Sequence, residues 1–108
     1  METFHEKLLR LAAVGKVRIS EHGYDELADD GLFARELVTG LASASVIEDY
    51  PNFAKGPCAL FLQTDMEGKP VHAVWGIPKG YDEPAVLVTA YRPDATRWDQ
   101  NFRKRLKP

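Results

Sequence analysis

The sequence has a single cysteine, Cys58, so no disulfide can form within the chain and a reducing compartment is the simplest setting. It has no stretch close to the roughly 18 consecutive apolar residues of a membrane-spanning helix. Residues 1–6 lack the basic start and apolar run of a signal peptide. These absences predict a cytoplasmic protein that does not engage a membrane. Cys58 opens the apolar run 58–62, which favours a small buried residue over a nucleophile.

Several catalytic signatures are missing as well. The histidines, His5, His22 and His72, are scattered and form neither a Cys-x-x-Cys nor a His-Glu-x-x-His pattern. The eight glycines stand singly, so no glycine-rich phosphate loop is present. We therefore expect neither a metal site nor a cofactor.

Composition and charge fit a single domain over residues 1–108, with 44% hydrophobic and 28% charged residues. The net charge of −2 conceals an asymmetry, because residues 1–54 carry 5 basic and 10 acidic side chains and residues 55–108 carry 9 and 6. A basic C-terminal end suits nucleic acid or an acidic partner. The alternative is a solvated helix with ordinary surface charge.

Apolar spacing predicts the helices. Residues with a period of three to four predict helices at 2–14, 21–29, 32–39 and 96–106. Ser20 is the expected N-cap of the second helix. In the last helix, Trp98 and Phe102 stand four apart and form the expected docking face.

Short alternating or continuously apolar runs bounded by turn residues predict strands at residues 16–19, 45–50, 58–64, 70–77 and 85–90. The last of these is apolar on both faces, which is typical of a strand with neighbours on both sides. The expected fold is therefore α+β, with N-terminal helices packed on one side of a small antiparallel sheet of three or four strands and a C-terminal helix.

Two local groups of residues can carry chemistry. Ser20-Glu21-His22 begins a predicted helix, where unpaired N–H groups favour an adjacent anion and the imidazole can take or pass a proton. The alternative is a histidine bonded to the backbone of a neighbouring strand.

The second group, Thr89-Ala90-Tyr91-Arg92-Pro93-Asp94, lies where the apolar strand 85–90 ends. There Arg92 can clamp a phosphate and Tyr91 can stack on a base, or Arg92 pairs with an acid of the N-terminal half and Tyr91 caps the core. His72, between Val71 and Ala73 of a predicted strand, is expected to be structural.

Together with Pro70-Val71-His72-Ala73-Val74 and Trp98, these two groups resemble the family named domain of unknown function 4258, which is grouped loosely with the RelE/ParE and BrnT toxins. The resemblance runs from about Val17 to Arg105. It implies a RelE/BrnT-like α+β fold and the toxin half of a toxin–antitoxin pair, which has a cognate antitoxin protein as partner and RNA as target.

The activity implied by the resemblance is metal-independent endoribonuclease cleavage. In that chemistry His22 is the base or acid, Arg92 stabilises the transition state, and Tyr91 positions the substrate or supplies a proton. Lys16 and Arg18 add phosphate contacts.

The chain departs from the family pattern on the helix after His22. It has Glu26 and Asp30 where arginines are common in the family, and such carboxylates repel an RNA backbone. A second hypothesis is therefore a non-catalytic interaction module of the same fold. In that case the acidic helix and the basic tail bind protein partners, either an antitoxin or a second copy of the chain.

Overall fold

A computed structural model describes residues 1–106, which form three α-helices, a short 3₁₀ turn and one five-stranded sheet. The α+β class is confirmed. The elements are α1 (Phe4–Ala13), β1 (Val17–Ile19), α2 (Glu21–Asp29), α3 (Ala34–Gly40), η1 (Leu41–Ser43), β2 (Ser45–Tyr50), β3 (Cys58–Thr64), β4 (Pro70–Gly76) and β5 (Ala85–Tyr91).

The sheet has the strand order β1-β5-β4-β3-β2. Strands β2 to β5 are antiparallel neighbours, whereas β1 pairs with β5 in parallel. The expectation of three or four purely antiparallel strands is therefore wrong: the short strand predicted at residues 16–19 joins the sheet at its edge and makes it mixed. Strand β5 has a neighbour on each side, as its apolar sequence predicted.

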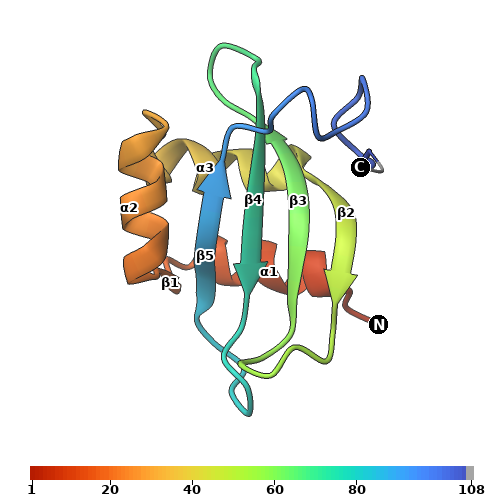
Figure 1. The fold of residues 1–108 in the computed structure, drawn as a ribbon. Coiled ribbons are helices and arrows are strands. Elements are labelled where there is room, and N and C mark those ends of the chain that lie inside the picture. Colours follow the sequence, from red (N-terminus) through yellow and green to blue (C-terminus); the bar gives the residue numbers. More distant parts are fainter. Residues whose placement is uncertain (107–108) are drawn as a thin grey trace.

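The helices cover one face of the sheet and leave most of the other face open. In Figure 1, α1 and α3 lie behind the sheet, and α2 stands beside β5. The covered face and the helices form the core, in which Leu8, Phe61 and Trp75 are completely buried. Alternate residues of the same strands, among them Leu60, Val74 and Thr89, point to the other face.

A buried glutamine joins the sheet to α3 inside this core. Gln63 accepts a hydrogen bond from the indole N–H of Trp75 at 2.8 Å and donates one to the Leu37 carbonyl at 2.9 Å. Each of these buried polar groups thus has a partner, which is required at such depth.

The C-terminal helix predicted at residues 96–106 is wrong, because this segment consists of turns closed by an isolated bridge between Trp98 and Arg105. The side chain of Asp94 accepts from the Thr96 N–H at 2.8 Å, and that of Asp99 accepts from the Arg103 N–H at 2.9 Å. Such local bonds compete with helical hydrogen bonding.

Helix α2 replaces β1 as the neighbour of β5 where β1 ends. The Ser20 N–H donates to the Leu87 carbonyl at 3.0 Å, and the Ser20 hydroxyl donates to the Val88 carbonyl at 2.6 Å. The same hydroxyl accepts from the Gly23 N–H at 2.9 Å, so Ser20 is the N-cap that the sequence predicted. One side chain therefore fixes the start of α2 against the middle of β5.

Gly23 permits this close approach, and Gly23→Ala tests it. A Cβ at this position would lie 2.9 Å from the Leu87 carbonyl oxygen and 3.2 Å from that of Val88. We expect the free energy of unfolding to fall by about 1–3 kcal/mol, the usual cost of overpacking. The measurement is urea denaturation followed by circular dichroism. Glycine to alanine in an unobstructed helix stabilises it by up to about 1 kcal/mol, so an increase in stability would contradict the packing described here.

Candidate functional site

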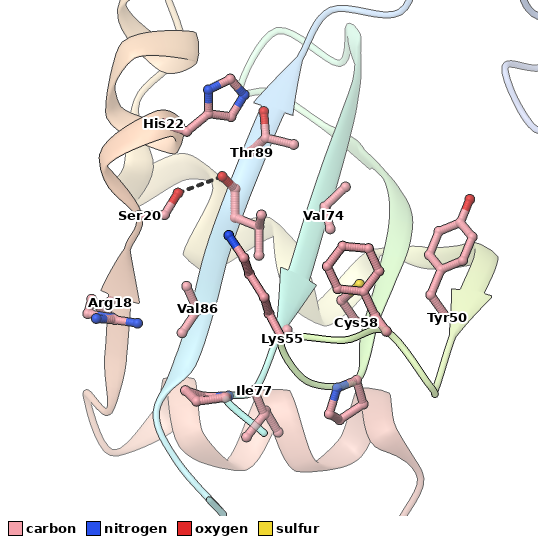
Figure 2. Close-up of a pocket in the computed structure, with 15 residues that line it drawn as sticks. Arg18, Ser20, His22, Tyr50, Lys55, Cys58, Val74, Ile77, Val86 and Thr89 are labelled. Atoms are coloured by element: carbon pink, nitrogen blue, oxygen red, sulfur yellow. Dashed lines mark hydrogen bonds between the residues drawn. The ribbon is translucent and has the colours of Figure 1, made fainter. Parts of the chain in front are cut away.

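A groove of about 710 Å³ lies on the open face of the sheet. Its floor is apolar and is formed by Val74, Val86, Val88 and Cys58 from three neighbouring strands. The β2–β3 loop and the start of α2 form its sides, as Figure 2 shows. The complete lining is Arg18, Ser20, His22, Tyr50, Phe53, Lys55, Pro57, Cys58, Val74, Gly76, Ile77, Pro78, Val86, Val88 and Thr89.

Three basic side chains lie around this groove, and no acidic residue lines it. Arg18 comes from β1, His22 from the first turn of α2, and Lys55 from the β2–β3 loop. In Figure 2 the Lys55 side chain extends along the groove toward the side that carries Ser20 and His22. The combination of an apolar floor and a basic rim can hold an anionic ligand that also has an apolar or aromatic surface.

His22 is exposed, and its ring lies beside Glu26. The side chain is 67% exposed, and its Nε2 lies 3.4 Å from Glu26 Oε1, one helical turn further along α2. The alternative in which His22 bonds the backbone of a strand is not what the structure shows, because the neighbouring Ser20 makes that bond. The serine therefore positions the helix, and the imidazole remains accessible at the groove.

Arg92 lies far from His22. Its guanidinium is 3.0 Å from Asp65 in the β3–β4 turn, and its backbone N–H donates to Asp30 at 2.8 Å. Asp30 is the C-cap of α2, whereas His22 lies in the first turn of that helix, and these eight positions correspond to about 12 Å. The predicted group of His22, Tyr91 and Arg92 around one anion therefore does not form. The internal ion pair was the alternative prediction for Arg92, but its side-chain partner is Asp65 and not an acid of the N-terminal half.

Tyr91 and Lys16 also lie outside the groove. Tyr91 is half-buried beside His72, with ring centroids 5.4 Å apart, and burial raises the pKa of its hydroxyl. Lys16 pairs with Glu83 at 2.7 Å before β1 begins. Of the five residues predicted to form the site, His22 and Arg18 line the groove and the other three do not.

Cys58 is buried, as the sequence predicted, and His72 is buried as well. Burial is the main cause that raises the pKa of the Cys58 thiol, so its reactive thiolate form is disfavoured. Burial also lowers the pKa of His72. Cys58 serves as part of the groove floor, and His72 lies beside the groove beneath the C-terminal segment.

Neither a metal-binding cluster nor a membrane-spanning helix is found among residues 1–106. No three His, Cys, Asp or Glu side chains come together there as ligands. No helix in that range is both long and apolar enough to cross a bilayer.

The fold and the groove thus define a small α+β domain that has helices on one face of a mixed sheet and a basic-rimmed groove on the other. A model of the family described as Domain of unknown function (DUF4258) matches residues 19–92, so this chain belongs to that family. The match contains α2, the whole of β2 to β5 and every groove residue except Arg18. Comparison with curated proteins gave no match, and neither did comparison with solved structures.

Proposed function

We propose that the chain is a toxin-like endoribonuclease that binds single-stranded RNA in the groove on the open sheet face and cleaves it without a metal. The observation that carries this proposal is that Arg18, His22 and Lys55, from three separate segments, line one groove without an acidic residue among its lining. Cations at the rim attract phosphates. The apolar floor and the exposed ring of Phe53 provide surfaces on which an unpaired base can stack.

His22 acts as the proton-transfer group in this proposal. The imidazole takes the proton of a ribose 2′-hydroxyl, and the 2′ oxygen attacks the adjacent phosphorus. Arg18 and Lys55 neutralise the charge that develops on the phosphoryl oxygens. The bond to the 5′ oxygen then breaks, and the imidazolium returns the proton to that oxygen. The products are a 2′,3′-cyclic phosphate and a 5′-hydroxyl end.

The carboxylates of α2 have other roles in this arrangement. Glu26 lies against His22 and orients its ring, and Asp30 fixes the end of β5 through the Arg92 N–H. Neither lines the groove. The acidic helix is therefore compatible with RNA on the open sheet face, and the link to RelE and BrnT toxins is part of this proposal.

The expected result is cleavage of a single-stranded RNA in the presence of EDTA, with cyclic phosphate ends detected by mass spectrometry. Arg18→Ala and Lys55→Ala should each weaken RNA binding about tenfold, and the double variant more, because each removes one phosphate contact. Arg35→Ala is the matched control, since Arg35 is an exposed arginine on α3 and lies outside the groove. Equal losses of RNA affinity in Arg35→Ala and Lys55→Ala would mean that binding depends on the total charge of the chain and not on the position of the cations at the groove.

A second candidate is a non-catalytic interaction module that binds an antitoxin. The observation in its favour is the apolar surface at the groove, where Tyr50, Phe53 and Val88 are 40%, 54% and 36% exposed. Under this alternative, the purified chain cleaves no RNA, and Phe53→Ser abolishes antitoxin binding. RNA cleavage by the purified chain that disappears in His22→Ala would exclude the non-catalytic module.

A further inference from the structure

The C-terminal segment, residues 93–106, folds back over the end of the open sheet face that carries His72, next to the groove. Figure 1 shows this segment in front of the sheet, at the end toward which β5 points. Trp98 is only 4% exposed and packs edge-on against the His72 ring, with centroids 4.3 Å apart. His72 and Val74 are alternate residues of β4 on the same face, so the covered surface and the groove are continuous.

His72 forms the first attachment of this segment. Its Nε2 lies 2.8 Å from the Phe102 carbonyl oxygen. A carbonyl only accepts, so Nε2 carries the proton. The other ring nitrogen, Nδ1, is buried and has no hydrogen-bond partner within residues 1–106. The attachment therefore requires a neutral ring, because a proton on Nδ1 would place an unpaired N–H and a positive charge in a buried site.

Arg105 forms the second attachment. Its guanidinium makes two bonds to Glu48 on β2, at 2.8 and 3.0 Å. It also lies over the Trp98 ring, 4.8 Å from the centroid. The segment is thus held at two points, one an ion pair and the other a neutral histidine.

We propose that residues 93–106 are a strap that covers the part of the open sheet face around His72 and is released by mild acidification, because His72 holds it only as a neutral ring. Release exposes His72 and Tyr91 and extends the groove along β4 and β5. The inference goes beyond the proposed function and does not depend on what the groove binds.

The direction of the pH dependence follows from the proton on His72. With the strap closed, the pKa of His72 lies below its ordinary value of 6.5, chiefly because the ring is buried. With the strap open, the ring is exposed and regains that value. Protons therefore bind the open form more tightly, and the closed form loses stability as the pH falls below 6.5.

The charged and titratable groups near His72 do not reverse this direction. The bond to the Phe102 carbonyl raises the pKa of His72, Arg105 on the strap lowers it and Glu48 on β2 raises it, and each of these effects is smaller than that of burial. Tyr91 on β5 remains uncharged, because burial raises the pKa of its hydroxyl. The pKa of Glu48 lies below its ordinary value of 4.5, mainly through its bond to Arg105, so the ion pair persists while His72 titrates.

The test is the indole N–H signals of Trp75 and Trp98 in a ¹⁵N–¹H spectrum recorded from pH 7.5 to 4.5. We expect the Trp98 signal to move to the chemical shift of a solvent-exposed indole, with a midpoint below pH 6.5. Trp75 is bonded to Gln63 in the core, so its signal should stay in place and report that the rest of the fold is intact. A Trp98 signal that does not move, or that is lost together with that of Trp75, would overturn the proposal.

Two variants and one control assign the effect to His72. His72→Gln keeps an N–H donor but cannot titrate, so the transition should disappear. Glu48→Gln loses the ion pair and weakens the closed form, so the midpoint should move to higher pH. The control is His5→Gln, because His5 Nε2 contacts the Leu41 carbonyl at 2.8 Å, away from the strap. If His72→Gln loses the Trp75 signal because it does not fold, Glu48→Gln replaces it as the test. In that case, a Trp98 transition whose midpoint is the same in Glu48→Gln as in the original chain would overturn the proposal.

Discussion

Replacement of His22 by alanine is expected to slow RNA cleavage by about 10²–10⁴-fold, the usual contribution of a general acid–base group. The reason is that His22 is the imidazole that lines the groove. RNA binding should change little, because Arg18 and Lys55 remain. The rate is measured under single-turnover conditions with EDTA present, and affinity is measured separately by fluorescence anisotropy.

Tyr24→Ala is the control for this variant. Tyr24 lies on the same helix, is 61% exposed and does not line the groove, so its replacement should leave the cleavage rate unchanged. Arg92→Ala is also expected to retain cleavage in molecules that remain folded, because Arg92 pairs with Asp65 away from the groove. Cleavage at the original rate in His22→Ala, or its specific loss in Arg92→Ala, would show that the assignment of the catalytic group is wrong.

The largest expected loss of stability is that of Gly56→Ala, by about 3 kcal/mol or more, because overpacking against backbone atoms adds to an unfavourable backbone conformation. Gly56 has φ +130°, and a Cβ there would lie 2.1 Å from the Ile77 carbonyl oxygen and 2.6 Å from the Lys79 nitrogen. Both atoms belong to backbone and cannot move aside as a side chain would. The loop must shift, and Lys55, the preceding residue, shifts with it. Urea denaturation measures the loss.

Gly68→Ala separates backbone strain from crowding. Gly68 also has a positive φ, +80°, but an added Cβ there would meet nothing within 4 Å. Its replacement should cost only about 1–2 kcal/mol, the penalty of the left-handed region for an ordinary residue. If Gly56→Ala and Gly68→Ala lower the free energy of unfolding by the same amount, the β2–β3 loop does not pack closely against residues 77–79.

The regular elements were largely predictable from the sequence, because each has a local pattern. Apolar spacing placed α1 and α3, alternating or apolar runs placed the strands, and Ser20 marked the start of α2. The parallel pairing of β1 with β5 was missed, because no local pattern shows which distant strand a three-residue segment will join. The C-terminal segment was predicted wrongly from the spacing of Trp98 and Phe102, because the side-chain turns at Asp94 and Asp99 override the helical period.

The site was predictable only in part, because local patterns mark single residues but do not show which distant segments come together. His22 and Arg18 were found because they lie at a helix start and on a strand beside it. The prediction that His22 and Arg92 share one site was wrong. His22 lies at the start of α2, whereas Arg92 is bonded to Asp30 at its end. The sequence does not show which end of the helix lies beside the end of β5. Lys55 was missed because its loop is far along the chain and reaches the groove only through tertiary folding.

The groove on the open sheet face is the central claim, and a chemical-shift titration of the ¹⁵N-labelled chain with a short single-stranded RNA tests it most directly. The result we predict is a set of shifted amide signals from Arg18, His22, Lys55 and Thr89, all of which line the groove. Shifts confined to α3 and the β3–β4 turn around Asp65, on other parts of the molecule, would contradict it, as would a spectrum that RNA leaves unchanged.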